Sequence, residues 1–560
     1  MPELALVDHE PAKFLFGLIP IHPPKMTNQR SGAPFYRVAA DAGYKVTVIR
    51  MPLETPPTDL PGGKLWSGLG VPDVRGTWGT FFYFGTDLTA WDVGDTEFGG
   101  KLVRLELNGN RADSSIEGPV DPATMSRRRI NAPVSFVVTP EGNAVTISLA
   151  GRSETVGERQ WSGWYSVKFR VTPLLALHAI CRFYVLQAQP DLRLYMTPLN
   201  MDPDDPPLPL SYPPGFTKDL VKRHGLFKTL GWWHDTWALN EEKIDEAVFL
   251  DDLFRTMQMN EDITLDELKN DPPSLLVSIF TSTDSVSHMF YRLIDPQHPR
   301  YDPELAAKYG NAILSVYERM DEVVGEVEKA MKPGATLLIV SDHGFHTWRK
   351  GFNTNTWLVQ NGFMTLKNPN VKEQTYNLAD LFGQGSFFPN VDWSHTRAYA
   401  LGLGQIYLNL RGREKQGIVD SGHEADQLLR DMQQKLMAFR DPDTGEPVLQ
   451  NVYFGQDIFH GARMPRAPDL QLTFRDGYRT SWQTSLGAIP AGIVVDNLKK
   501  WSGDHCASDP SDTQGIFLSN RKLTSGNPSI LDVDPTVLQL LSVPPPQSVD
   551  GRAMQLTAGN

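Results

Sequence analysis

The stretch LLVSIFTSTDSVSH, from Leu275 to His288, decides the fold together with TLLIVSDHG, from Thr336 to Gly344. Each is an apolar run of the kind found in buried strands, and each leads directly into polar residues. Between them, the amphipathic pattern from Pro303 to Met331 predicts one long helix. A strand, a helix and a second strand in this order predict a βαβ unit with parallel strands. Ligands bind at the carboxyl ends of such strands, where both polar motifs lie.

The rest of the chain extends this α/β pattern and interrupts it once. PFYRVAADAG followed by KVTVI, within residues 33–57, predicts a helix and then a strand. Between Phe98 and Pro198 the apolar period changes to two, over six strand-like runs: KLVRLELN, PVSFVVTP, AVTISLAG, WSGWYSVKFRV, HAICRFYVLQA and LRLYMTP. We therefore expect an α/β fold with a mostly parallel central sheet flanked by helices and an all-β insertion. Residues 1–97 would be the N-terminal part of the core, 98–200 the insertion and 201–560 the remainder.

Charge and cysteine content exclude several classes of protein. The 560 residues carry 53 Lys and Arg against 66 Asp and Glu, a formal net charge of −13. Without a basic stripe we expect no binding to a nucleic-acid duplex, although a small phosphorylated substrate remains compatible with bound metal ions. The two cysteines, Cys181 and Cys506, are too few for a disulfide scaffold or a thiolate zinc site.

No membrane or export segment is expected within the chain as given. The longest apolar run, Val171 to Leu186, is too short to span a bilayer and contains His178 and Arg182. The residues from Met1 to Phe14 lack the basic and apolar regions of a signal peptide. We expect a soluble, cytoplasmic protein, with export the alternative if a signal peptide precedes this chain.

Candidate metal ligands follow each of the two decisive strands. Asp284 and His288 are four residues apart, so a helix would place both side chains on one face, within reach of one divalent ion. The alternative is that Asp284 caps the helix and His288 only packs. Asp342 and His343 are adjacent, and Gly344 would permit the sharp bend that lets both reach an ion. Here too the alternative is a capping aspartate beside a loop histidine.

A third motif adds His505, which lies in the loop sequence WSGDHCASDPSDTQG. Two aspartates and three histidines without a thiolate suit zinc or manganese in a catalytic site. We interpret the neighbouring Cys506 as a small buried residue. A further group could line a substrate pocket but is interpreted as a surface loop: His346, Trp348, Arg349 and Asn353.

These motifs resemble the alkaline phosphatase superfamily. STDSVSH, SDHGF and the late GDH followed by GIF are similar to its type I phosphodiesterase/nucleotide pyrophosphatase-like members and to its predicted phosphohydrolase/phosphomutase branch, from about Gly32 to Gly551. The resemblance implies an alkaline-phosphatase-like fold and two divalent ions, zinc or else manganese or magnesium. It also implies a ligand set in which one ion is held by Asp284, His288 and His505 and the other by Asp342 and His343.

The same resemblance implies a Thr or Ser nucleophile, and a further aspartate ligand, ahead of PFYRVAADAG. We expect both, with the first strand, to be encoded upstream of this chain, so no catalytic nucleophile is assigned here. Asp8 with Thr27 or Ser31 is the alternative within the chain. The expected function is metal-dependent hydrolysis of phosphomonoesters or phosphodiesters. The alternative is a truncated, inactive relative that binds a metal ion or another ligand.

Overall fold

The computed structural model describes residues 28–558 except 29, 89–93, 96–98, 122–127, 173–174, 371–387 and 525, together with residues 13–14 and 19–20. Asp8 and Thr27 lie outside the described residues. The chain forms two compact units. One, called here the histidine unit, comprises Val286–Leu314 and Ile339–Leu518. The other, called the strand-rich unit, comprises Pro2–Ser285, Ser315–Leu338 and Ser519–Asn560.

A parallel α/β layer forms part of the strand-rich unit. Helix α1 (Phe35–Asp41) leads into strand β3 (Val46–Met51), which confirms the helix and strand expected here. β3 pairs in parallel with β4 (Lys64–Ser67) and with β18 (Leu275–Ser278), and β4 pairs in antiparallel with β17 (Ser211–Tyr212). The neighbours Val48 and Ile49, which point to opposite faces of the strand, are both fully buried, as expected for a strand covered on both faces.

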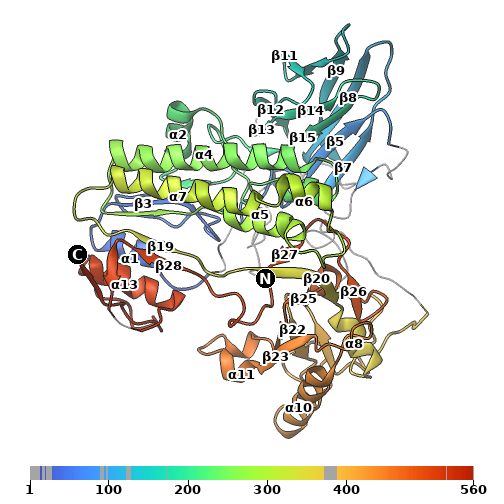
Figure 1. The fold of residues 1–560 in the computed structure, drawn as a ribbon, viewed down its shortest axis with the longest axis vertical. Coiled ribbons are helices and arrows are strands. Elements are labelled where there is room, and N and C mark those ends of the chain that lie inside the picture. Colours follow the sequence, from blue (N-terminus) through green and yellow to red (C-terminus); the bar gives the residue numbers. More distant parts are fainter. Residues whose placement is uncertain are drawn as a thin grey trace. The chain divides into compact units, whose positions relative to one another are not determined.

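Long helices accompany this layer. α4 (Glu246–Asn270) and α7 (Ala312–Ala330) run side by side in Figure 1, and Arg319 of α7 forms an ion pair with Glu261 of α4. The single helix predicted from Pro303 to Met331 is instead two helices, because α6 (Pro303–Tyr309) ends at Gly310 before α7 begins. Glycine is a common helix terminator because it costs backbone entropy within a helix.

Each of the six strand-like runs between Phe98 and Pro198 contains a strand. The strands of this region and their partners form three sheets, in the orders β11-β10-β9-β8, β12-β13-β16 and β14-β15-β5-β7-β6. Their bounds are β5 (Phe81–Gly85), β6 (Gly94–Asp95), β7 (Gly100–Arg104), β8 (Arg111–Val120), β9 (Arg129–Val138), β10 (Ala144–Leu149), β11 (Arg152–Gly157), β12 (Tyr165–Arg170), β13 (Ala176–Cys181), β14 (Phe183–Gln187), β15 (Arg193–Met196) and β16 (Asn200–Met201).

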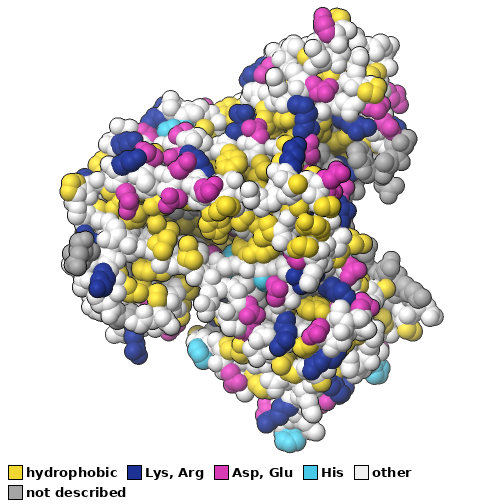
Figure 2. Space-filling model, in the orientation of Figure 1, with side chains coloured by type: hydrophobic (Ala, Val, Ile, Leu, Met, Phe, Trp, Pro, Cys, Tyr) yellow, Lys and Arg dark blue, Asp and Glu magenta, His cyan; other side chains and the backbone are white. Residues whose placement is uncertain are grey.

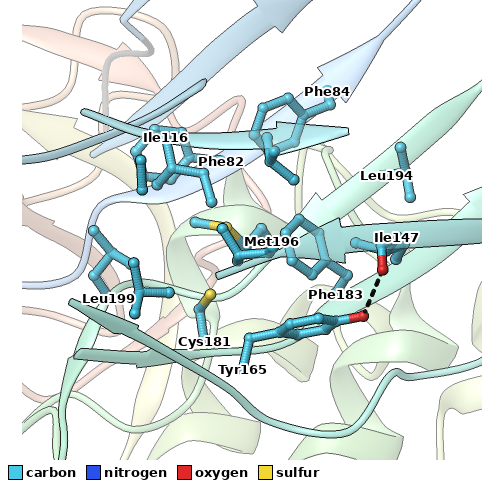
Figure 3. Close-up of a cluster of buried hydrophobic side chains, with 14 of the residues drawn as sticks. Phe82, Phe84, Ile116, Ile147, Tyr165, Cys181, Phe183, Leu194, Met196 and Leu199 are labelled. Carbon is cyan, nitrogen blue, oxygen red and sulfur yellow. Dashed lines mark hydrogen bonds between the residues drawn. The ribbon is translucent and has the colours of Figure 1, made fainter. Parts of the chain in front are cut away.

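One hydrophobic core joins these strands. Phe84, Phe136 and Phe183 are fully buried and meet one another at ring-centroid distances of 5.2–6.3 Å. Figure 3 shows Phe183 beside Tyr165, whose hydroxyl donates a hydrogen bond to the Ile147 carbonyl at 3.1 Å. Buried residues alternate with half-buried residues along β10 and with exposed residues along β12, which explains the period of two in the sequence.

Strand β20 (His346–Phe352) is the centre of the histidine unit. It pairs in parallel with β25 (Gly477–Thr480) and in antiparallel with β26 (Val494–Asp496) and β27 (Gly503–Asp504). A second sheet has the order β21-β22-β24-β23. Its strands are β21 (Ala398–Ala400), β22 (Gln405–Leu408), β23 (Leu449–Phe454) and β24 (Leu470–Phe474). Besides α6, this unit contains the helices α8 (Thr354–Gln360), α10 (His423–Ala438), α11 (Gly455–Ile458) and α12 (Trp482–Ser485).

The fold is mixed α/β, but one mostly parallel central sheet is not confirmed. The described strands divide into several sheets, many of them antiparallel, and β19 (Leu338–Val340) pairs with β28 (Phe517–Ser519) in a two-stranded sheet of its own. The remaining helices and strands are β1 (Lys13–Phe14), β2 (Ile19–Pro20), α2 (Phe216–His224), α3 (Thr236–Asn240), α5 (Ser282–Phe290), α13 (Val533–Leu540), β29 (Arg521–Leu523) and β30 (Leu556–Ala558). Among the described residues, no helix combines the length and the apolarity needed to cross a membrane.

Candidate metal centre

Helix α5 carries the first pair of predicted ligands. It begins at Ser282, so Asp284 lies within the first turn and is not the N-cap that the alternative required. His288 follows one turn later on the same helix, and residues four apart share a helix face. The structure therefore keeps Asp284 and His288 in the arrangement that the spacing predicts.

His288 is buried and held in one orientation. Its Nδ1 lies 2.7 Å from the Gly503 carbonyl oxygen. Its ring centroid is 4.0 Å from that of Trp501 and 4.8 Å from that of Phe345. Because a carbonyl only accepts hydrogen bonds, Nδ1 carries the proton and Nε2 the lone pair. A histidine ligand held through its second nitrogen in this way has its tautomer and its ring plane fixed.

His343 and His505 meet His288 within the histidine unit. The rings of His343 and His505 are stacked, with centroids 3.4 Å apart and planes 8° apart. The His288 and His505 ring centroids are 5.2 Å apart. Asp342 remains beside His343, with its Oδ1 3.6 Å from His343 Nε2 and a side chain that is 79% exposed. Three imidazoles from separate segments thus converge, with one exposed carboxylate next to them.

Asp504, a further residue beside these histidines, was not predicted. It is fully buried, and its Oδ1 accepts hydrogen bonds from the backbone N–H groups of His505 at 2.8 Å and Cys506 at 2.7 Å. Burial alone would raise the pKa of Asp504, but the Arg479 guanidinium, together with His288, His505 and the backbone N–H of Cys506, outweighs burial and holds that pKa well below its usual range. The position of Asp504 immediately before a candidate ligand, in GDHC, was the only signal in the sequence.

Comparison with known families places this site in context. The model of the family described as type I phosphodiesterase / nucleotide pyrophosphatase matches residues 179–492, more than half of the chain. The chain belongs to this family. Membership places it in the alkaline phosphatase superfamily and supports phosphoester hydrolysis. No curated protein and no solved structure matches the chain.

The match to the type I phosphodiesterase family covers four of the five predicted ligands. Asp284, His288, Asp342 and His343 lie within the matched residues, whereas His505 lies beyond them. The geometry described above nevertheless brings His505 against His343 and His288. The case for His505 as a ligand therefore depends on its contacts in the structure and not on the family match.

Gly344 serves a different purpose from the one expected. Its φ angle is not among the positive values of the chain, so the glycine is not needed for a left-handed bend. Instead, a Cβ at this position would lie 2.7 Å from the Gln514 carbonyl oxygen. The small residue permits close approach of the backbone around Thr513, to whose carbonyl the Gly344 N–H donates at 2.8 Å.

The expectation that the residues after Gly344 form a surface loop was wrong. His346 and Trp348 lie in β20 and are 6% and 4% exposed, and Asn353 directly after this strand is 1% exposed. Neighbouring strands pair with both edges of β20, which places His346 and Trp348 within a sheet rather than in a loop. Arg349 forms hydrogen bonds with Asp295 through Nε at 2.6 Å and Nη2 at 3.1 Å.

Cys506 lies against the candidate ligands. It is partly exposed, and its Sγ lies 3.9 Å from His505 Nδ1. Burial raises the pKa of the Cys506 thiol, and the neighbouring Asp504 carboxylate raises it further. With no metal ion bound, the Cys506 side chain is therefore a thiol. Zinc binds the thiolate form instead.

Proposed function

We propose that this chain is a metal-dependent phosphoric ester hydrolase that acts on phosphomonoesters or phosphodiesters. The observation that carries the proposal is the convergence of His288, His343 and His505, which come from three distant segments of the histidine unit. Membership of the type I phosphodiesterase family supports small phosphorylated substrates. On the face shown in Figure 2, positive and negative side chains are interspersed. We propose that no nucleic-acid duplex is a partner, because acidic residues outnumber basic ones and the formal net charge is −13.

The donor chemistry of the centre fits divalent metal ions. Imidazole nitrogens and carboxylate oxygens are the ligands of catalytic zinc and are compatible with manganese. We assign one ion to Asp284, His288 and His505 and a second to Asp342 and His343, with zinc as the first candidate and manganese or magnesium as alternatives. Such ions supply positive charge that stabilises the phosphoryl group as it is transferred.

The residues of the chain itself contribute orientation. Gly503 holds His288 through its carbonyl, and Asp504 holds the turn that presents His505. A Thr or Ser nucleophile, together with a further aspartate ligand, is proposed to come from a segment upstream of Met1. Residues 98–200 are proposed as a β insertion in an α/β core formed by residues 1–97 and 201–560.

The test uses the full chain with any coding sequence in frame upstream of Met1. Hydrolysis of bis-p-nitrophenyl phosphate and of p-nitrophenyl phosphate is measured with Zn²⁺, with Mn²⁺ and after treatment with a chelator. We expect turnover that the chelator abolishes, and loss of that turnover in His288→Ala and in Asp342→Ala. His423→Ala, which changes an exposed histidine of the same unit, is the control.

Unchanged turnover in either ligand variant would refute the metal assignment. A protein that binds metal ions in stoichiometric amount but hydrolyses neither substrate would instead support the alternative, a catalytically inactive relative that binds a metal ion or a phosphorylated ligand.

A further inference from the structure

A buried ion pair lies next to the three histidines. Arg479 of β25 and Asp504 of β27 are both inaccessible to solvent, and Arg479 Nε lies 2.9 Å from Asp504 Oδ2. The guanidinium also lies against two indoles whose planes are 70° apart, with its carbon 4.5 Å from the ring centroid of Trp348 and 4.1 Å from that of Trp482. Two cation–π contacts thus hold the cation in addition to the ion pair.

Stability alone gives little reason for such a pair. Desolvating two charges costs free energy that their attraction recovers only with excellent geometry, and apolar residues of similar volume often serve as well. A buried charge pair can instead serve to hold neighbouring groups in place. Here those neighbours include a candidate ligand, because Asp504 is adjacent to His505.

The hydrogen bonds of Asp504 define the shape of the segment that presents His505. Oδ1 accepts from the backbone N–H groups of His505 and Cys506, and Oδ2 accepts from Trp501 Nε1 at 2.9 Å. Both carboxylate oxygens are thus engaged by the protein. Antiparallel pairing with β20 then places Asp504 opposite His346, three residues after His343.

The same segment also holds His288. The Gly503 carbonyl accepts from His288 Nδ1 at 2.7 Å, and the Ser502 N–H donates to the His288 carbonyl. Asp504 Oδ2 lies 3.9 Å from His288 Nδ1. Displacement of the turn at Asp504 would therefore move two of the three imidazoles together.

We propose that Arg479 is a positioning residue of the metal centre, which acts through Asp504 to fix His505 and His288. This inference rests on the proposed function, because it assigns Arg479 a role in binding the same metal ions. In this proposal Asp504 is not itself a metal ligand, although its carboxylate lies within 4.8 Å of the potential ligand atoms of His505 and Cys506. An oxygen that already accepts two backbone hydrogen bonds is an organiser of the turn.

The experiment measures Zn²⁺ affinity by competition with a chromophoric chelator. It compares the wild type, Arg479→Met, Arg479→Lys and Arg413→Met. Arg413 is the matched control, because it pairs with Asp469 at 2.6 Å in the same unit but contacts none of the candidate ligands in the described structure. Loss of a group that orients metal ligands reduces affinity about 10–100-fold. We expect that loss in Arg479→Met, partial recovery in Arg479→Lys, and wild-type affinity in Arg413→Met.

The sign of the change separates the two roles open to Asp504. If Asp504 were itself a ligand, removing its cationic partner would leave or raise the affinity, and that result would overturn the proposal. Arg479→Met leaves Asp504 buried without its partner, so the double variant Arg479→Met/Asp504→Asn provides a second, uncharged protein. A folded double variant with wild-type affinity would also overturn it. Absence of Zn²⁺ and Mn²⁺ binding by the wild type would refute the proposed function itself, and this inference with it.

Discussion

The imidazole rings of His343 and His505 lie face to face, 3.4 Å apart at their centroids, although 162 positions separate the two residues in the numbering of the chain. Imidazole binds metal ions in its neutral form, and neutral rings can stack face to face without charge repulsion. The stack is therefore compatible with ligands held close together before any metal ion arrives.

Replacing either stacked ring should weaken metal binding. We expect His343→Ala and His505→Ala each to lower Zn²⁺ affinity by more than about 100-fold, because loss of a direct ligand should exceed the effect of losing a group that only orients one. Isothermal titration calorimetry measures the affinity and the number of ions bound. The exposed His423→Ala should retain both, and retention of both in His505→Ala would remove this residue from the ligand set.

The close approach of β27 to α5 depends on the absence of a side chain at Gly503. A Cβ on Gly503 would lie 2.4 Å from the Ser287 carbonyl oxygen and 2.6 Å from Tyr291 Cδ2. Gly503→Ala should therefore push β27 away from the helix and stretch the hydrogen bond to His288. Overpacking of this kind costs about 1–3 kcal/mol, so we expect a lower melting temperature together with weaker Zn²⁺ binding.

Gly325 of α7 provides the matched control for that substitution. An added Cβ would meet no atom within 4 Å there, and its φ is not positive. Gly325→Ala should raise the free energy of unfolding by about 0.5–1 kcal/mol, because alanine loses less backbone entropy in a helix. A Gly503→Ala protein as stable as Gly325→Ala, with unchanged metal affinity, would contradict the close-approach argument.

The sequence predicted those parts of the site whose chemistry is local. Asp284 and His288 are related by one helical turn, so their spacing sufficed to place them on one face of α5. His343 and His505 could be nominated as ligands, but their stacking depends on long-range packing that no spacing encodes. Asp504 was missed because its role is visible only once Arg479, distant in sequence, is seen against it.

Sequence patterns also predicted individual elements better than their assembly. The alternation of apolar residues predicted the strands around Ile147 and Val167, and a run of β-branched residues predicted β3. Both signals are local and can be recognised in a short stretch of sequence. The division into several sheets depends on which edges pair, and amphipathicity alone did not reveal the break at Gly310. His346 was placed on the surface because flanking polar residues concealed that β20 is paired on both sides.

The aromatic core of the strand-rich unit should dominate the stability of that unit. Phe183 is fully buried and its ring lies 5.6 Å from that of Tyr165 and 5.9 Å from that of Phe136. Phe183→Ala should lower the free energy of unfolding by about 3–5 kcal/mol through lost burial and the cavity left behind. Urea unfolding followed by circular dichroism measures the loss, and a change below about 1 kcal/mol would contradict the described packing.

His298 should make the protein less stable in mild acid. Burial lowers the pKa of His298 to about 4, and Arg292 and Arg349 act in the same direction, while its hydrogen bond to the Trp348 carbonyl and Asp295 oppose the shift. In the unfolded chain its pKa is near the ordinary value of about 6.5. Between these two values only the unfolded state binds the proton, so stability must fall as the pH decreases from about 6.5 to about 4.

Replacement by glutamine isolates this contribution. His298 accepts from the Arg300 N–H at Nδ1 and bonds the Trp348 carbonyl at Nε2, and glutamine offers one acceptor and one donor without a proton to bind. The urea midpoint of His298→Gln should therefore fall less steeply than that of the wild type between pH 6.5 and 4.5. Part of the slope should persist, because burial also lowers the pKa of His234, to about 3. His423→Gln should keep the full wild-type slope, and an equal slope in His298→Gln would show that His298 is protonated in the folded protein.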